Sequence, residues 1–296
     1  MFNNILGNDR IKELLINSIK MNKTSHSYLF VGTEGIGKTL IAKEFAKMIL
    51  CSDENKYCNK CKSCIEFDTN NNPDFKIIEP DGNSLKIEQI REFQSKVAEK
   101  PIISNKKVYI IKDSDKMTQE AQNCLLKTLE EPPGYVVIIL IGSNENAFLS
   151  TIKSRCMILH FDKISNEEIE KYLEENHQIK INSKIMIDAF QGSIGKALQL
   201  KEKQEEYERI EEIIYNLENK DKIDILNMSE IIYKSKDDKQ EILDYMNVVF
   251  LNLAKKSSKY ANCIHIVEET KKRLQSNANY DMCIDNMLFS LWEQVN

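Results

Sequence analysis

The sequence predicts an α/β domain with a parallel sheet, followed by a small helical domain and an all-α C-terminal domain. Two observations support this prediction. Through residues 1–160, short apolar runs alternate with helical patterns, the order that covers both faces of a parallel sheet with helices. After Gly195 the chain contains neither glycine nor proline, as expected for a helical bundle. The expected domains are 1–163, 164–202 and 203–296.

Five apolar runs are expected to form the strands, and the fourth is apolar nearly throughout, as a strand buried on both faces should be. These runs are residues 28–31, 75–78, 108–111, 135–141 and 157–161. Helices are expected at 38–50, from about 84, and at 118–131, where Pro132 and Pro133 stop the pattern. Ser165 and Glu168 have the spacing of a capping box that begins the helical part.

The composition is that of a globular protein with a substantial core. The chain has 296 residues, of which 42% are hydrophobic and 29% charged. Its formal net charge of −5 creates no general attraction for nucleic acid, so any DNA contact would be local or shared with partners. No apolar run approaches the roughly 20 residues of a membrane span, and the N-terminus lacks a secretory core. We therefore expect a cytoplasmic protein without a membrane partner, in which the eight cysteines stay reduced.

Residues 32–39 match the phosphate-binding pattern G-x-x-x-x-G-K-[ST]. Gly32, Gly35 and Gly37 let the backbone N–H groups point at a phosphate chain. Lys38 would reach the β- and γ-phosphates, and the Thr39 hydroxyl would contact Mg²⁺. A strand before the loop and a helix after it supply the required context. The pattern predicts a nucleotide-binding ancestry and allows ATP or ADP to bind; the alternative is a loop that has kept its shape and lost its ligand.

The strand that should carry the magnesium-binding acid is altered. ATPases of this kind need one acid to hold Mg²⁺ and a second to prepare the attacking water. Here Lys112 and Asp113 follow the strand 108–111, and an ammonium repels Mg²⁺. A shift of one residue would place Asp113 at the metal but Ser114 at the water, and would turn the strand over. Either register loses one acid, so we expect no ATP hydrolysis unless Asp113 or Asp115 compensates.

Four cysteines in the spacing C-x6-C-x2-C-x2-C suggest a metal site in an insertion at 51–64. Four thiolates suit a closed tetrahedral site for structural Zn²⁺. An iron–sulfur site is the rival, but the outlying cysteine lies upstream and no Cys-Pro follows. Four free thiols are the remaining alternative. The predicted ligands are Cys51, Cys58, Cys61 and Cys64.

Arg155 is one of only five arginines and lies between a helical stretch near 147–152 and the last predicted strand. A guanidinium at an exposed corner can stabilise charge on a phosphate held by an adjacent subunit. Taken alone, a solvated surface arginine is the simpler interpretation.

The chain resembles the bacterial clamp-loader ATPases of DNA polymerase III. The resemblance is carried by residues 26–30 and 107–111, the stretch Leu125 to Pro133 (LLKTLEEPP), Ser154-Arg155-Cys156, and the four cysteines, and it spans residues 5–200. It implies a RecA-like P-loop domain of the AAA+ class, a helical lid, and a C-terminal collar that joins subunits.

Within this family the chain is more similar to the non-hydrolysing delta-prime subunit than to the tau/gamma motor, which stays the alternative. The motor has an acid at the position of Lys112 and a lid arginine at the position of Gly195. Ser143 or Asn144 could fill the polar sensor position of either subunit, so that position does not distinguish them. The resemblance implies a subunit of the DNA polymerase III holoenzyme, a DNA-directed DNA polymerase, without ATPase activity of its own. It would assemble with tau/gamma and delta subunits, place Arg155 in a neighbour's ATP site, and help load the sliding clamp on primed DNA.

Two further classes remain open. A DNA-binding zinc protein would need a basic surface with aromatic residues near the cysteines, where the sequence offers Tyr57 and Phe67. A scaffold without any nucleotide role would differ in nucleotide binding and in its response to the loss of Arg155.

Overall fold

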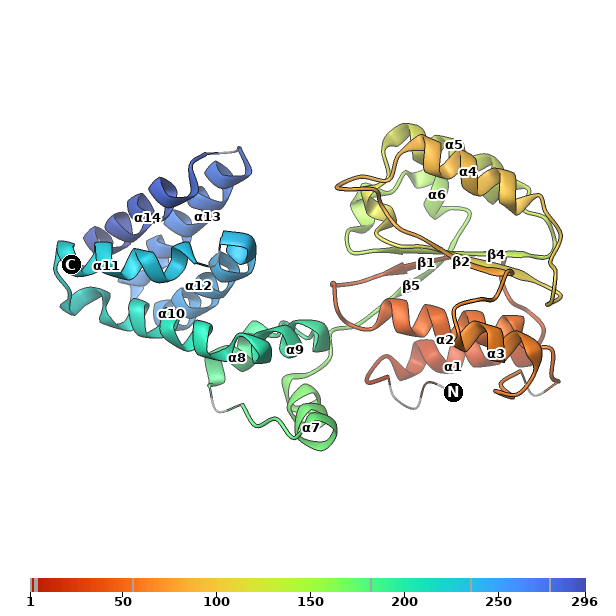
Figure 1. Ribbon diagram of the computed structural model, residues 1–296, viewed down its shortest axis with the longest axis horizontal. Helices are drawn as coiled ribbons and strands as arrows, with labels where there is room; N and C mark the ends of the chain where they lie inside the picture. Colours follow the sequence, from red (N-terminus) through yellow and green to blue (C-terminus); the bar gives the residue numbers. More distant parts are fainter. Residues whose placement is uncertain (1, 3–4, 55, 182, 235, 277) are drawn as a thin grey trace. The chain divides into compact units, whose positions relative to one another are not determined.

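A five-stranded parallel sheet organises the N-terminal part of the computed structural model (Figure 1). Its order is β2-β3-β4-β1-β5, and each neighbouring pair is parallel. The predicted parallel sheet is confirmed, and the predicted strand ends differ from the observed ones by at most one residue. The strands are β1 (Ser27–Val31), β2 (Phe75–Ile78), β3 (Lys107–Ile111), β4 (Val136–Gly142) and β5 (Met157–His160).

The structure describes residues 2, 5–54, 56–181, 183–234, 236–276 and 278–296. They form two compact units. The first comprises Met1–Tyr172 with Gly192–Gly195, and the second comprises Leu173–Gln191 with Lys196–Asn296. The finer division into domains at 1–163, 164–202 and 203–296 stays a prediction.

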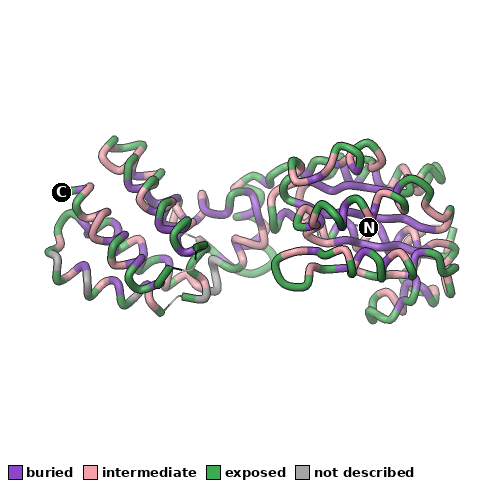
Figure 2. Tube along the Cα trace, turned by 90° about the horizontal axis from the view of Figure 1, so that it is seen from above, coloured by how far each residue is buried: buried purple, intermediate pink, exposed green. Residues whose placement is uncertain are grey.

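Helices cover both faces of the sheet (Figure 1). The helices of one face are α1 (Asp9–Lys20), α2 (Lys38–Leu50) and α3 (Lys62–Asp68), and those of the other are α4 (Ile87–Val97), α5 (Gln119–Glu130) and α6 (Ser150–Lys153). Because strand side chains alternate, Val108 and Ile110 enter one core and Tyr109 and Ile111 the other. The three central strands β3, β4 and β1 are accordingly buried along their length (Figure 2). The sequence analysis had not identified α1 and α3.

The second unit is helical, as predicted. Its helices are α8 (Lys184–Ala189), α10 (Gln204–Asn216), α11 (Lys222–Tyr233), α12 (Lys239–Ala254), α13 (Ala261–Gln275) and α14 (Tyr280–Val295). Ile242, Met246 and Val249 on α12 and Leu288 and Leu291 on α14 are buried, so these residues form the core of this unit. Of the helices in the described residues, none combines the length and the apolar character needed to cross a lipid bilayer.

Two helices lie at the borders of the units, and short 3₁₀ helices connect the longer elements. The border helices are α7 (Asn166–His177) and α9 (Ile194–Glu202). The predicted capping box before α7 is present, because Ser165 N donates to Glu168 Oε2 at 3.1 Å and Glu168 N donates to Ser165 Oγ at 3.3 Å. The 3₁₀ helices are η1 (Ser114–Lys116), η2 (Glu145–Ala147), η3 (Leu217–Asn219), η4 (Lys236–Asp238) and η5 (Ser258–Tyr260).

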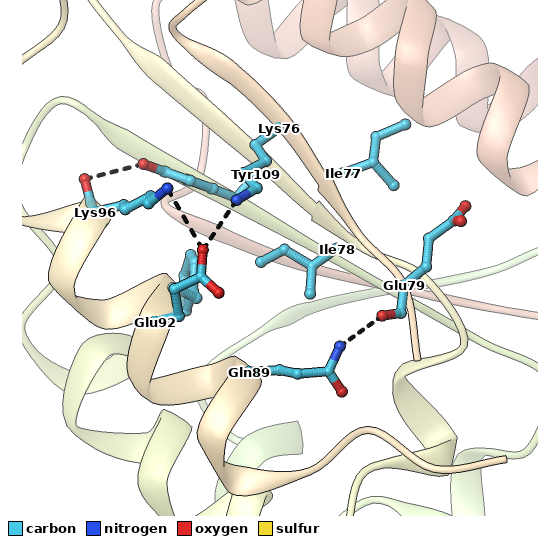
Figure 3. Close-up of a pocket in the computed structure, with 9 residues that line it drawn as sticks. Lys76, Ile77, Ile78, Glu79, Gln89, Glu92, Lys96 and Tyr109 are labelled. Carbon is cyan, nitrogen blue, oxygen red and sulfur yellow. Dashed lines mark hydrogen bonds and ion pairs between the residues drawn. The ribbon is translucent and has the colours of Figure 1, made fainter. Parts of the chain in front are cut away.

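Strand β2 forms one edge of the sheet and borders a small cavity of about 190 Å³ (Figure 3). Glu92 on α4 lies 3.4 Å from the ammonium groups of both Lys76 and Lys96. Gln89 donates to the backbone oxygen of Glu79 at 2.8 Å. Charged side chains along an exposed edge discourage pairing with a strand of another chain. We therefore interpret this cavity as part of the protected edge of the sheet.

A buried carboxylate fixes the segment that enters β3. Asp74 is 2% exposed and accepts hydrogen bonds from the backbone N–H groups of Ile102, Ile103 and Ser104 at 2.7, 2.8 and 2.7 Å. Three donors on one carboxylate satisfy backbone groups that would otherwise lose their partners on burial. Asp74 therefore joins the start of β2 to the segment that follows α4.

Replacing this carboxylate should destabilise the sheet locally. We expect Asp74→Ala to lower the free energy of opening around β2 and β3 by about 2–3 kcal/mol, because three N–H groups lose a charged acceptor. Hydrogen exchange followed by mass spectrometry on peptides from 75–111 measures this change. The exposed Glu13 on α1 provides the control Glu13→Ala, which should leave exchange in these peptides unchanged. Equal exchange in the two variants would show that Asp74 has no such role.

Candidate nucleotide site, arginine corner and metal centre

The glycine-rich loop connects β1 to α2, as a phosphate-binding loop requires. Gly35 and Gly37 have φ angles of 76° and 92°, which L side chains rarely adopt. Gly37 is the N-terminal cap of α2, and Lys38 and Thr39 are its first two residues. The loop therefore keeps the backbone shape and the helix N-terminus that favour an anion.

Lys38 is folded back onto its own loop. Its Nζ donates to the backbone oxygens of Gly32 at 2.6 Å and Thr33 at 2.7 Å, and the residue is 7% exposed. Phosphate oxygens can replace carbonyl oxygens as acceptors without moving the helix that carries the lysine. The side chain is thus held inside the loop that would surround a phosphate chain.

The surroundings of Lys38 act on its pKa in two opposite directions, and the net result is a lowered pKa. Burial lowers the pKa of its ammonium, and the carboxylates of Asp115, Glu34 and Asp113 act in the opposite direction. These carboxylates lie near the loop, so they favour a cation there in the absence of a nucleotide.

The loop is also in direct contact with the turn that begins α9. Gly195 N donates to Gly35 O at 3.2 Å, and a Cβ atom on Gly35 would lie 2.1 Å from Ser193 Oγ. A Cβ on Gly195 would lie 3.2 Å from Gly35 Cα, closer than side chains normally approach. The two glycines therefore permit a close backbone contact between the loop and the turn that begins α9. The absence of an arginine at position 195 stays an expectation from the resemblance, and this packing role was not predicted.

The residues after β3 form ion pairs of their own. Lys112 Nζ lies 2.9 Å from Glu79 Oε1, just beyond the end of the neighbouring strand β2. Asp113 has a φ angle of 47° and pairs with Lys116 at 3.1 Å. The ammonium that follows β3 is thus neutralised by an acid next to the edge strand, and Asp113 is engaged by a second lysine.

Asp115 joins the ends of β3 and β4. Its Oδ2 accepts hydrogen bonds from Ser143 N at 3.0 Å, Ser143 Oγ at 2.8 Å and Asn144 N at 3.0 Å. The buried Ser114 Oγ donates to Ile141 O at 2.8 Å. Burial by itself would raise the pKa of the Asp115 carboxyl, but the hydrogen bonds from Ser143 and Asn144 lower it overall. The two candidate sensor residues are therefore held by an acid whose role the sequence did not reveal.

Arg155 follows α6, and its side chain contacts residues of α5 and α6 in the same chain. Its Nη2 is 2.7 Å from Glu130 Oε1 at the end of α5, and its Nη1 donates to Thr151 O at 2.9 Å and Ser154 Oγ at 3.3 Å. The side chain of Arg155 keeps 33% of its surface exposed. A planar guanidinium with a free edge at the surface can still bind an external anion.

Gln122 fixes the element that carries Arg155. This residue of α5 is 4% exposed; its Nε2 donates to Ala147 O at 2.9 Å and its Oε1 accepts from Leu149 N at 2.9 Å. One amide side chain thus holds the connection between η2 and α6 against α5. The backbone that leads to Arg155 is therefore held against α5.

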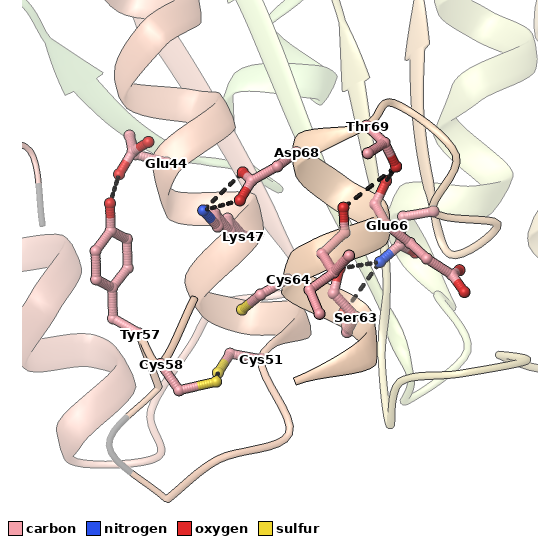
Figure 4. A network of polar contacts seen from close by, with 12 residues as sticks. Glu44, Lys47, Cys51, Tyr57, Cys58, Ser63, Cys64, Glu66, Asp68 and Thr69 are labelled. Carbon is pink, nitrogen blue, oxygen red and sulfur yellow. Dashed lines mark hydrogen bonds and ion pairs between the residues drawn. The ribbon is translucent and has the colours of Figure 1, made fainter. Parts of the chain in front are cut away.

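The four predicted cysteines come together in one cluster, of which Figure 4 shows Cys51, Cys58 and Cys64. Their sulfur atoms all lie within 4.8 Å of one another, and the Cys51 and Cys58 sulfurs are 3.6 Å apart. Tetrahedral zinc with bonds of about 2.3 Å places its sulfur ligands roughly 3.8 Å apart. Cys58 and Cys61 each accept a backbone N–H from the cysteine three residues later, at 3.3 and 3.4 Å. The donor set and its spacing therefore fit a metal ion.

The insertion is anchored to the P-loop helix by two further pairs (Figure 4). Tyr57 donates to Glu44 at 2.7 Å, and Lys47 lies 2.7 Å from Asp68. Cys51 terminates α2 and Cys61 caps α3. The cluster thus connects the helix that follows the phosphate loop to the helix of the insertion.

The sheet and the glycine-rich loop between β1 and α2 define a P-loop domain, in which the residues after β3 are engaged in ion pairs. A family model described as "DNA polymerase III, delta subunit" matches residues 7–165, and the chain therefore belongs to this family. The DNA polymerase III subunit delta′ of Bacillus subtilis is 28% identical, with 96% of each chain covered. The gamma/tau subunit of Mycoplasma pneumoniae is 36% identical over 67% of this chain, which spans only 30% of that relative.

The fold has a solved counterpart. A DNA polymerase III gamma subunit-related protein of Thermotoga maritima superimposes with a TM-score of 0.55 at 17% identity, covering 96% of this chain and 99% of that one. At this identity the likeness concerns the fold alone. It extends over both the α/β unit and the helical unit.

The contribution of Asp115 to the stability of the fold should decrease as the pH falls. Because its folded pKa is depressed, the ionised carboxylate stabilises the fold above the unfolded pKa of about 3.9, and this contribution is lost as the pH falls through the folded value. We expect Asp115→Asn to cost about 1–2 kcal/mol at pH 7, measured by urea denaturation, and the difference from the unmodified protein to shrink below about pH 4. A difference that stayed constant down to pH 3 would contradict this assignment.

Proposed function

We propose that this chain is the delta-prime-type subunit of a DNA polymerase III clamp loader, and that it supplies Arg155 to the ATP site of a neighbouring tau/gamma subunit. The observation that carries the proposal is a division of roles within one domain. The residue after β3 is Lys112, bound to Glu79, whereas Arg155 stands at a partly exposed corner held by α5 and α6. The chain is thus poorly equipped to hydrolyse ATP and well equipped to assist a neighbour.

Arg155 would assist the neighbouring subunit through the positive charge of its guanidinium. As a γ-phosphoryl group is transferred, negative charge spreads over its oxygens, and a guanidinium placed there stabilises the transition state. Arg155 is suited to this role because its planar fork stays charged and binds two oxygens at once. In the chain's own site, position 112 carries a lysine paired with Glu79 in place of the acid that would hold Mg²⁺.

The phosphate loop supports a static nucleotide. We propose that Gly32, Gly35, Gly37, Lys38 and Thr39 can hold ATP or ADP without hydrolysis. Support comes from the retained loop shape and from the position of the Lys38 ammonium, whose carbonyl partners can be exchanged for phosphate oxygens. The nucleotide would serve to stabilise the domain.

The partners follow from the family. We propose that the chain assembles with tau/gamma and delta subunits in the cytoplasm and reaches the sliding clamp and primed DNA through that complex. A net charge of −5 suits contact with DNA through the assembly better than through this chain alone. Four large apolar side chains of the helical unit are exposed and available for collar contacts. They are Tyr215, Ile223, Leu251 and Met282.

The cysteine cluster is proposed to hold one structural Zn²⁺. Four thiolates complete the coordination of zinc, so its bound state would be closed to solvent ligands. The ion would stabilise the insertion at 51–64 by tying α2 to α3.

The ATP-hydrolysing tau/gamma motor is the second candidate, and the 36% identity to the Mycoplasma pneumoniae gamma/tau subunit together with the intact loop favours it. The two candidates differ in the activity of the isolated chain. A delta-prime-type subunit should show no turnover above background, whereas a motor would hydrolyse ATP alone.

Loss of Arg155 should reduce the ATPase rate of a complex reconstituted with tau/gamma and delta. We expect Arg155→Ala to lower the clamp- and DNA-stimulated rate at least tenfold, because the transition state loses a guanidinium. Steady-state phosphate release measures the effect.

Arg91→Ala is the matched control, since Arg91 is an exposed arginine of α4 in the same unit. This variant should retain the full rate. A complex containing Arg155→Ala that assembled normally and kept its ATPase rate would exclude a role for Arg155 in trans.

Zinc should be present and should order the insertion. We expect about one zinc per chain by elemental analysis, and expect Cys64→Ser to lower this content strongly because a buried ligand is lost. Cys124→Ser, which changes a half-buried cysteine outside the cluster, should retain the metal. Chelation should increase hydrogen exchange across 51–68, and unchanged exchange after complete zinc removal would argue against a structural role.

A further inference from the structure

The carboxylate that contacts Arg155 comes from a neighbouring helix. Glu130 is the last residue of α5, and its Oε1 lies 2.7 Å from Arg155 Nη2. The side chains retain 49% and 33% of their exposed surface, respectively. The pair therefore lies at the surface, where the guanidinium would meet an adjacent subunit, and remains accessible to it.

Both residues are attached to parts of the fold that are held together. Thr118 caps the start of α5 by accepting from Ala121 N, and Gln122 links the first turn of this helix to the segment that begins α6. Because each helix is continuous, these contacts at their starts also restrict how far the ends of α5 and α6 can separate. An ion pair between them restricts the arginine side chain without requiring the backbone to adjust.

The guanidinium keeps donors available while it is held. An arginine has five N–H donors. Among the described residues, its recorded partners are Thr151 O, Ser154 Oγ and Glu130 Oε1, which account for three of them. The remaining donors can reach phosphate oxygens of a second subunit while the other contacts are kept.

We propose that Glu130 is a positioning residue for Arg155: its carboxylate holds the guanidinium in the orientation used to contact a neighbour's nucleotide. The inference rests on the proposed role of Arg155 in trans. A free arginine side chain samples many rotamers, and restricting it in advance lowers the entropic cost of forming the phosphate contacts. Glu130 acts through Arg155 and has no contact with the nucleotide itself.

The opposite role is a restraint, in which the ion pair must break before Arg155 can act. The two roles predict opposite changes in rate when the carboxylate is removed. Positioning predicts a slower reaction, because the transition state loses a correctly oriented donor, whereas restraint predicts a faster one.

The test uses the full chain carrying Glu130→Gln in the reconstituted loader. We expect kcat for stimulated ATP hydrolysis to fall about 2–5-fold while KM for ATP changes little, the size expected for an exposed ion pair whose effect is felt in the transition state. Glu130→Asp, which keeps the charge, should recover part of the loss. In the Arg155→Ala background, Glu130→Gln should cause no further change, since Glu130 acts only through the arginine.

Glu131→Gln removes the same charge one residue further along an exposed stretch and should retain the full kcat. An increase in kcat for Glu130→Gln would overturn positioning in favour of restraint. If Glu130→Gln lowered kcat equally with and without Arg155, Glu130 would have a structural role, and the inference would also be overturned. If Arg155→Ala itself had no effect, the proposed function would fail; if it slowed the complex while Glu130→Gln did not, only the present inference would fail.

Discussion

The hydrogen bonds that Asp115 accepts from Ser143 and Asn144 are the contact on which the candidate site depends. They connect the segment after β3, which contains Lys112 and Asp113, to the end of β4, from which the chain continues to α6 and Arg155. The parallel sheet makes this possible because neighbouring strands end at the same edge. A change at the end of β3 is thereby linked structurally to the position of an arginine some forty residues later.

The proposed function separates holding a phosphate chain from hydrolysing it. Two contacts support this proposal: Lys38 is held inside the glycine-rich loop, and Lys112, at the position proposed for the metal-binding acid, is paired with Glu79. The hydrogen bond between Gly195 and Gly35 shows that the turn before α9 packs closely against the loop, so a side chain at position 195 would require the neighbouring backbone to shift.

Much of the fold was predictable, because its signals are local. The strands were predicted to within one residue, and α2 was predicted in full, since buried strands and the loop-to-helix transition have strong sequence patterns. The four cysteines were recognisable from their spacing and do converge. Helix α3 was overlooked because it is short and lies inside the cysteine insertion. The roles of Asp74, Gln122 and Glu130 depend on partners roughly 25 or more residues away, which a linear pattern does not reveal.

The sequence by itself determined the class of fold, the phosphate loop, the cysteine cluster, and the residue types at positions 112 and 155. These properties follow from the side chains present and from their spacing along the chain. Only the tertiary structure decided which acid each cation meets, because ion pairs form between ends of strands and helices that the sheet brings together. In the folded chain Lys112 pairs with Glu79 and Arg155 pairs with Glu130. Asp115 accepts a hydrogen bond from the backbone N–H of Ser143, just after β4.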